Sequence, residues 1–170
     1  MNVTIRHAEP DDYDTIISAV DAWWGGRQMA VMLPRLFFTH FRPWTYVAVH
    51  DNAVVGFLAG FQSQTTPSQV YCHFIGVDPG SRGKGVGEAL YQRLFAEAAT
   101  NGCQEVLAVT APANRGSIAF HTRIGFQPLP GSDSEGHIPY TPDYDGPGED
   151  RVRFRKQLYE ASMQPPSLDN

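Results

Sequence analysis

Positive charge, cysteine and long apolar runs are all scarce in this chain of 170 residues. Its 13 Lys and Arg residues against 18 Asp and Glu give a formal net charge of −5, so no overall basic field attracts nucleic acid. Two cysteines cannot build a disulfide framework, and they favour free thiols in a reducing compartment. No apolar stretch approaches the ~18 residues of a membrane span, and the N-terminus lacks the apolar run of a signal peptide. We therefore expect a soluble, cytoplasmic protein without a nucleic-acid or membrane partner.

Hydrophobic residues are plentiful enough for one packed domain. They make up 42% of the chain, with ten Phe, seven Tyr and three Trp, so general disorder is excluded. We expect one domain over residues 1–160 and a flexible C-terminal tail at 161–170. Apolar periodicity predicts helices over 9–24, 30–40, 86–100 and 114–124, and strands over 3–5, 46–49, 54–61, 70–77, 106–110, 126–129 and 151–158. Helices and strands mix without strict alternation, so the predicted class is α/β (α+β) with a mixed sheet.

The segment over residues 124–150 differs from the rest of the chain. It holds no Lys or Arg, but it has six acidic residues, five Pro and five Gly. This composition makes packed structure improbable and predicts a long acidic loop over about 130–150.

The most informative segment for chemistry is a glycine-rich stretch over residues 77–87, VDPGSRGKGVG. It joins a predicted strand to a predicted helix, whose first N–H groups lack helical partners and favour an anion. Its alternating glycines would let a diphosphate approach the main chain, and one Arg and one Lys add positive charge. A P-loop would need Lys followed by Ser or Thr, and a dinucleotide fingerprint would need glycine instead of Glu88. At this point a glycine-rich turn without a ligand is the alternative.

Two motifs together resemble the GNAT superfamily of N-acetyltransferases. Residues 82–87 (RGKGVG) are similar to its acyl-CoA pyrophosphate loop, Arg/Gln-x-x-Gly-x-Gly/Ala, and residues 75–79 (IGVDP) are similar to the strand and turn before it. Residues 114–126 resemble the second signature of the family, from an initial Asn to a final Gly-Phe. The likeness follows the element order over residues 3–158. It implies a mostly antiparallel, twisted sheet flanked by helices, in which a central pair of strands splays apart around pantetheine.

The resemblance implies acetyl-CoA as the acyl donor and direct transfer of the acetyl group to a primary amine. The residues that it places at the cofactor are Ile75, Gly76, Val77, Arg82, Gly83, Lys84, Gly85, Val86, Gly87, Asn114 and Ser117. Asn114 is also suited to be the N-cap of the helix that follows, and the two roles are compatible. The histidines and cysteines show no ligand spacing, so no metal is expected.

Three residues are candidates for proton transfer. The family usually has a Tyr acid after the aromatic residue of the second signature, whereas this chain has His121 there. An imidazole can donate a proton to the leaving thiolate, or it can only support the substrate or pack beside the cofactor. Tyr71 stands where some members have a catalytic Glu. His73, expected on the same strand face as Tyr71 and Ile75, could relay a proton through water or be structural.

The acceptor amine, on a small molecule or a peptide, is not identified by the sequence. The loop after the first helix borders the acceptor site in the family, so Trp24 is a candidate lining residue. Asp143 and Asp145, without a compensating base, would attract a cationic amine, and Tyr144 could stack against it. The alternative is a solvated loop whose acids only aid solubility.

Two other classes of function compete with catalysis. Because the usual Tyr and Glu are absent, the alternative is an idle acyl-CoA-binding sensor or interaction module. A nucleotide-binding regulator would need one of the phosphate-binding motifs that the chain lacks. The sequence leaves a homodimer open.

Overall fold

The computed structural model describes residues 1–158, so the predicted tail at 161–170 lies outside the described residues. The helices are α1 (Asp12–Trp23), α2 (Val86–Thr100) and α3 (Arg115–Arg123). The strands are β1 (Thr4–His7), β2 (Tyr46–His50), β3 (Ala53–Gln62), β4 (Gln69–Val77), β5 (Glu105–Thr110), β6 (Gln127–Pro128), β7 (Asp133–Glu135), β8 (Ile138–Tyr140) and β9 (Val152–Gln157).

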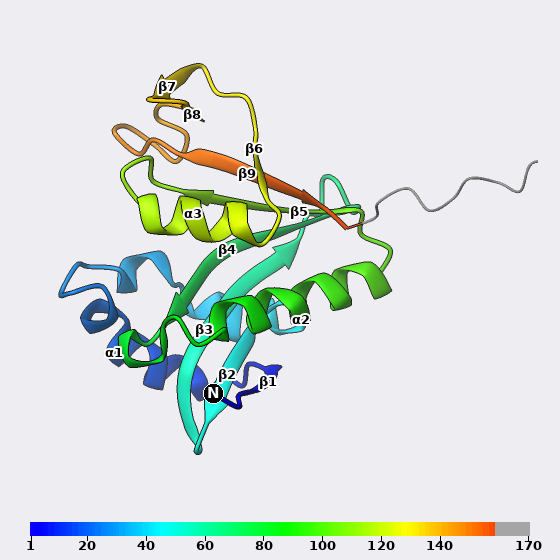
Figure 1. The fold of residues 1–170 in the computed structure, drawn as a ribbon. Coiled ribbons are helices and arrows are strands. Elements are labelled where there is room, and N and C mark those ends of the chain that lie inside the picture. Colours follow the sequence, from blue (N-terminus) through cyan, green and yellow to red (C-terminus); the bar gives the residue numbers. More distant parts are fainter. Residues whose placement is uncertain (159–170) are drawn as a thin grey trace, which may run out of the picture.

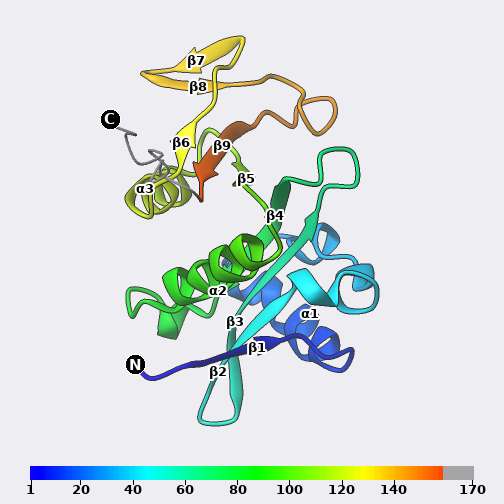
Figure 2. The same ribbon diagram turned by 90° about the vertical axis from the view of Figure 1, so that its right-hand side faces the viewer.

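Seven strands form one sheet in the order β1-β2-β3-β4-β5-β9-β6, and β7 and β8 form a separate hairpin (Figure 1). All neighbouring strands of the sheet are antiparallel except β4 and β5, which are parallel and joined through α2. The α2 helix lies on one face of the sheet and α1 on the other (Figure 2). The predicted mixed, mostly antiparallel sheet flanked by helices is confirmed.

Two hydrophobic clusters pack the two faces of the sheet. One contains the buried faces of α2 and α3, and the other contains α1 and the segment that follows it. The predicted stripe of α2, Val86, Leu90, Leu94 and Ala98, is at most 1% exposed. A four-residue spacing places these side chains on one side of the helix, which explains why α2 covers the sheet.

The strands β4 and β5 separate after a short paired stretch. Their register runs only over Gln69–Cys72 against Glu105–Ala108, although β4 continues along β3 to Val77. Beyond Cys72, the main-chain groups of β4 that face β5 have no ladder partner. The predicted splay of the central pair is confirmed, and it opens the sheet at its middle.

A β-bulge changes the direction of side chains along β4. The register between β3 and β4 skips His73. Ile75 then packs on the α2 side, as Cys72 does, whereas the His73 ring stacks on Phe37 on the α1 side. The expectation that Tyr71, His73 and Ile75 share one strand face is therefore wrong, because an extra residue shifts the alternation.

The predicted helix over 30–40 is also wrong. The chain instead forms short 3₁₀ turns, η1 (Ala30–Met32), η2 (Arg35–Phe38) and η3 (Arg42–Trp44). Pro34, between the first two, is extended with φ −63° and ψ 141°. Proline cannot donate a helical hydrogen bond and disfavours helix in the residue before it, so it interrupts the helix.

The acidic segment is more ordered than the sequence indicated. Instead of a continuous loop over about 130–150, it contains the β7–β8 hairpin, with Asp133 opposite Tyr140. A second contact, the bridge between Thr141 and Arg151, closes the base of the following turn.

Candidate functional site

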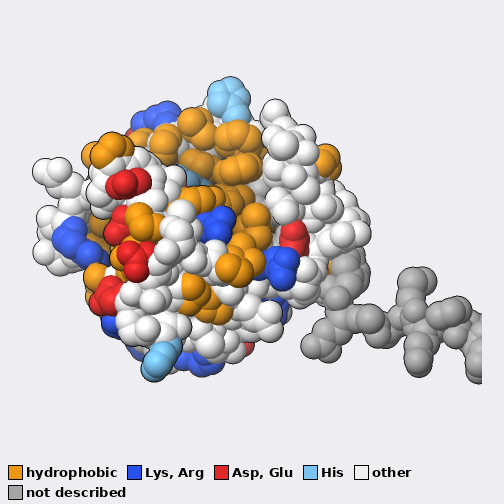
Figure 3. All heavy atoms as spheres, turned by 90° about the horizontal axis from the view of Figure 1, so that it is seen from above, with side chains coloured by type: hydrophobic (Ala, Val, Ile, Leu, Met, Phe, Trp, Pro, Cys, Tyr) orange, Lys and Arg blue, Asp and Glu red, His pale blue; other side chains and the backbone are white. Residues whose placement is uncertain are grey.

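A cavity of about 870 Å³ lies between the end of α1, the outer part of β4, the glycine-rich loop and α3. It includes residues of β4 beyond the point where β4 and β5 separate. Seen from above, hydrophobic side chains gather in the middle of the upper face of the molecule (Figure 3). The residues that line the cavity are Trp23, Trp24, Gly25, Arg27, Ile75, Val77, Ser81, Arg82, Gly83, Gly85, Val86, Gly87, Glu88, Asn114, Gly116, Ser117, Phe120, His121 and Arg123.

The glycine-rich loop presents its main chain to this cavity. Gly83 and Gly85 have left-handed backbones, with φ +71° and +83°, and Gly85 is the N-cap of α2. A Cβ atom at either position would meet no atom within 4 Å, so this backbone faces open space. Within the described residues, the N–H groups of residues 83–88 have no hydrogen-bond partner. Free N–H groups at a helix N-terminus form an anion site.

The two cations of the loop hold its shape. Arg82 donates from Nε to the Val77 carbonyl at 3.0 Å and from Nη2 to the Trp23 carbonyl at 2.5 Å. Lys84 Nζ donates to a carbonyl of the preceding turn at 2.7 Å. Arg82 therefore joins the loop to the end of α1, and the positive charge of both side chains stays beside the free N–H groups.

Trp24 covers β4 from the α1 side of the sheet. Its ring lies 5.2 Å from the Phe74 ring, and a Cβ atom on Gly76 would come within 2.7 Å of it. Glycine at position 76 therefore makes room for Trp24, which lines the cavity. Gly76 itself does not line the cavity.

Asn114 begins α3 at the edge of the cavity. Its Oδ1 accepts the Ser117 N–H at 3.1 Å, so the N-cap interpretation is confirmed. Asn114 and Ser117 both line the cavity, so the side chain of each can reach a cofactor bound there.

His121 lies in a buried hydrogen-bond chain. Its Nδ1 lies 2.8 Å from the Ser117 carbonyl and 3.2 Å from the Ser117 hydroxyl, and its Nε2 lies 2.8 Å from the Tyr91 hydroxyl. A carbonyl only accepts, so Nδ1 carries the ring proton and Nε2 accepts the Tyr91 O–H. Tyr91 also hydrogen-bonds Cys72, so the chain connects β4, α2 and α3.

Burial decides the charge of His121. The residue is 2% exposed and its ring stacks on Phe154 at 5.1 Å. This desolvation lowers the pKa of the imidazole, and the hydrogen bond to the Ser117 carbonyl only partly opposes the shift. Both nitrogens of a neutral ring are therefore engaged, which favours packing over the expected acid role.

Tyr71 and His73 lie on the α1 side of β4, and neither lines the cavity. Burial, with smaller effects of the neighbouring Tyr144 and Asp145, raises the pKa of Tyr71, so its phenol stays protonated. His73 Nε2 lies 2.7 Å from the Met32 carbonyl, so Nε2 carries the proton. Among the described residues, His73 Nδ1 has no hydrogen-bond partner and can accept a proton.

The acids of the segment after β8 do have a compensating base, contrary to the expectation from sequence. Arg151, 8% exposed, pairs with Asp145 at 2.6 Å and with Glu149 at 2.8 Å. Asp143 accepts a main-chain N–H within the same turn, and its own N–H donates to Asp150. Acidic side chains gather on one side of the upper face (Figure 3). Asp143, Tyr144 and Asp145 do not line the cavity, and these carboxylates already have partners.

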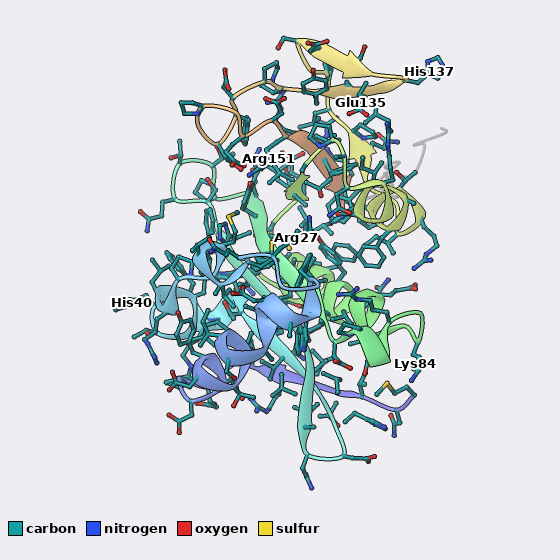
Figure 4. The ribbon with its side chains drawn as sticks, turned by 90° about the vertical axis from the view of Figure 1, so that its left-hand side faces the viewer. Arg27, His40, Lys84, Glu135, His137 and Arg151 are labelled. Carbon is teal, nitrogen blue, oxygen red and sulfur yellow. The ribbon has the colours of Figure 1, made fainter. Side chains whose placement is uncertain are left out.

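Two arginines of the cavity have no anionic partner for their side-chain charge among the described residues. Among the described residues, Arg27 and Arg123 are the arginines whose side chains have neither a hydrogen bond nor an ion pair, and both line the cavity. Arg123 lies 5.6 Å from the centre of the Phe120 ring. Arg27 is exposed and lies near the centre of the face drawn in Figure 4, whereas Lys84 lies towards the edge of that view. Among residues 1–158, Glu88 is the one acidic side chain that lines the cavity, so the cavity favours anions in a chain of net charge −5.

The cavity brings together most of the predicted cofactor residues. All of them except Gly76 and Lys84 line it, together with Trp24 and, of the three catalytic candidates, His121. The lining residues that the sequence did not single out are Trp23, Gly25, Arg27, Ser81, Glu88, Gly116, Phe120 and Arg123. Arg123 could have been found, because it lies three residues after Phe120 on the same helix.

Metal and membrane features were searched over residues 1–158. No group of three or more His, Cys, Asp or Glu side chains in this range could hold a metal ion. No helix in the same range is long and apolar enough to cross a membrane. Cys72 and Cys103 are buried free thiols.

Comparisons with known proteins agree with this geometry. The model of the acetyltransferase (GNAT) family matches residues 9–126, so the chain belongs to this family. L-2,4-diaminobutyric acid acetyltransferase of Nocardia farcinica is 34% identical over 80 residues, which are 47% of this chain but only 42% of that relative.

Solved structures show the same fold. A GNAT-family protein from Desulfovibrio desulfuricans has a TM-score of 0.75 at 18% identity, covering 93% of this chain and 100% of that one. The yncA protein of Salmonella typhimurium, solved with its cofactor acetyl-CoA, has a TM-score of 0.68 at 22% identity. The match covers 94% of this chain and 96% of that one.

Proposed function

We propose that this protein is an acetyl-CoA-dependent N-acetyltransferase that acts on a primary amine. The observation that carries the proposal is the row of free N–H groups at residues 83–88, which faces the cavity beside the separated strands. Membership of the GNAT family and the likeness to a diaminobutyric acid acetyltransferase support it.

The chain's own groups fit acetyl-CoA. The N–H groups of residues 83–88 would hold the diphosphate, and Arg123 adds a free positive charge for a phosphate. The unpaired main chain of β4 after Cys72 would pair with the amides of pantetheine. Acetyl-CoA supplies a thioester: the acceptor nitrogen bonds to the acetyl carbon, the C–S bond breaks, and one proton leaves nitrogen while one reaches sulfur.

We assign the proton movements to two residues of the chain. His73 lies on the α1 side of β4, outside the cavity lining, and its Nδ1 has no hydrogen-bond partner among the described residues, so it would take the amine proton through water. The Ser117 hydroxyl lines the cavity, and its oxygen accepts the His121 ring proton. The hydroxyl hydrogen is then free to donate towards sulfur, and His121 acts as a positioning residue.

Two glycine variants and an amine panel test this function. Gly85→Val should weaken acetyl-CoA binding by about tenfold or more, because a branched side chain strains the left-handed backbone and fills the anion site. Gly102→Val is the matched control, since Gly102 has φ +74° at the far end of α2. Both variants should lose about 1–3 kcal/mol of stability, and only Gly85→Val should lose binding, measured by calorimetry.

Release of free CoA thiol in the presence of amines then measures turnover. Amine-dependent release supports the enzyme. Acetyl-CoA binding without release for any amine class would support the idle binding module instead. Equal binding by Gly85→Val and the parent would show that the loop is not the cofactor site.

A further inference from the structure

The free guanidinium of Arg27 is a cavity charge that the cofactor loop does not require. The loop already has its own free N–H groups and two cations beside them. Arg27 comes from a different part of the chain, the segment that follows α1. It lines the cavity from this segment, and Figure 4 shows it near the centre of the view, apart from α3.

The segment that carries Arg27 is held firmly. Asp21 Oδ1 accepts the N–H groups of Met29 and Ala30, both at 2.7 Å, and the Asp21 carbonyl accepts the Gly26 N–H at 2.8 Å. These bonds fix the main chain on both sides of Arg27. A charge on a fixed turn can select a ligand by geometry as well as by attraction.

The same segment contacts the candidate base. The carbonyl of Met32, five residues after Arg27, accepts the His73 Nε2–H at 2.7 Å. Arg27 and His73 thus belong to the α1 side, next to the loop after the first helix, which the GNAT resemblance implies as the border of the acceptor site. The acids once expected to bind a cationic acceptor are instead engaged by Arg151 and main-chain N–H groups. The uncompensated charge on this side of the cavity is positive.

We propose that Arg27 binds a carboxylate of the acceptor, so that the acceptor is an amino acid or another amine that carries a carboxylate. The inference rests on the proposed acetyltransferase function and specifies its substrate class. A guanidinium forms paired hydrogen bonds to a carboxylate, which orients the amine as well as attracting the molecule. The amine nitrogen loses one proton as its bond to the acetyl carbon forms, and the carboxylate stays unchanged.

Pairs of acceptors that differ only in the carboxylate test this inference. The probes are L-2,4-diaminobutyrate with 1,3-diaminopropane, L-ornithine with 1,4-diaminobutane, and L-lysine with 1,5-diaminopentane. For at least one pair, the parent should prefer the amino acid in kcat/KM. Arg27→Met should lower kcat/KM for that amino acid by about 10- to 100-fold, the effect of one charge-assisted contact, and leave the matching diamine unchanged. Arg27→Lys should restore part of the loss.

Control measurements separate the acceptor from the cofactor. The KM for acetyl-CoA should be the same in Arg27→Met and the parent. Arg155→Met, on β9 and outside the cavity, should change neither constant. A rise in the KM for acetyl-CoA with the amino-acid preference intact would assign Arg27 to the cofactor and overturn the inference.

Two other outcomes are distinguishable. A parent enzyme that acetylates each diamine as well as its amino acid would overturn the carboxylate inference and leave the acetyltransferase function standing. A protein that binds acetyl-CoA but transfers acetyl to none of the six probes, nor to other amines, would overturn both.

Discussion

At the scale of single residues, the local environment decides what a motif position does. The sequence places His121 where the GNAT resemblance implies an acid, and it cannot show that Tyr91 and the Ser117 carbonyl occupy both ring nitrogens. Ser117 lies one turn earlier on the same helix, but Tyr91 belongs to α2 and becomes a neighbour only after packing. Asn114 is the opposite case: an N-cap acts within three residues, so its bond to the Ser117 N–H was readable from sequence.

The lowered pKa of His121 predicts a specific dependence of stability on pH. The folded protein resists protonation of this buried ring, whereas the unfolded chain takes up a proton near the ordinary pKa of about 6.5. The free energy of unfolding should therefore be at its full value above about pH 6.5 and fall as the pH drops below it, by at most about 1.4 kcal/mol per pH unit. Urea unfolding between pH 7.5 and 5 measures this.

The control for that prediction is His121→Gln, which cannot titrate. It should be less stable at pH 7 by about 1–3 kcal/mol, because the variant loses the ring that stacks on Phe154 and is held at both nitrogens by Tyr91 and Ser117. Its difference from the parent should shrink as the pH falls, since the other histidines contribute equally to both. A difference that stays constant with pH would mean that His121 does not titrate between the two states.

At the scale of elements, the features that depend on local sequence could be predicted, and those that depend on long-range contacts could not. The α2 stripe and the loop before it follow from spacing and glycine content. The bulge at His73 has no local signal, because it exists only in the register between β3 and β4. That the Arg27 side chain has no ion pair could not be predicted either, since this depends on which side chains other segments bring near it. The prediction of a helix over 30–40 is wrong although the sequence contained a signal against it, Pro34.

Arg151 gives the element-scale prediction. It joins the start of β9 to the acidic turn through Asp145 and Glu149, so its removal leaves two carboxylates without their partner. Arg151→Met should lower the free energy of unfolding by about 1–3 kcal/mol. Arg155→Met, which removes only a long contact of 3.8 Å between the exposed Arg155 and the half-buried Glu105, should cost less than about 0.5 kcal/mol.

Substitution of the acidic residues themselves tests the hypothesis that this segment binds the acceptor. Asp143→Asn with Asp145→Asn should lower stability and leave the acceptor KM unchanged, because these carboxylates serve the turn. Urea unfolding and steady-state kinetics give the two readouts. An acceptor KM that rises most at low salt, with stability intact, would instead return the cationic-acceptor interpretation.

At the scale of the whole molecule, charge is separated between surface and cavity. The chain carries a net charge of −5, yet the described cavity has free arginines from two segments and a row of unpartnered N–H groups. The sheet makes this separation, because the splay of β4 from β5 opens a site between the two layers of helices. Composition alone predicts an acidic protein. Only the fold shows where the positive charge is concentrated.

This separation predicts a salt-sensitive stabilisation by acetyl-CoA, whose phosphates would enter the positive cavity. A ligand at 100 times its Kd stabilises the folded state by about 2.7 kcal/mol, which raises the Tm of a chain of this size by about 5–10 °C. At a fixed acetyl-CoA concentration, the shift should shrink as ionic strength rises from about 0.05 M to 0.5 M, because salt screens partly exposed charges. The same salt series without ligand gives the correction for the protein itself. Arg123→Met should reduce both the shift at low salt and its dependence on salt, since one of the free cavity charges is gone. A shift of equal size across the series would mean that apolar contacts, rather than the arginines and the N–H groups of residues 83–88, hold the cofactor.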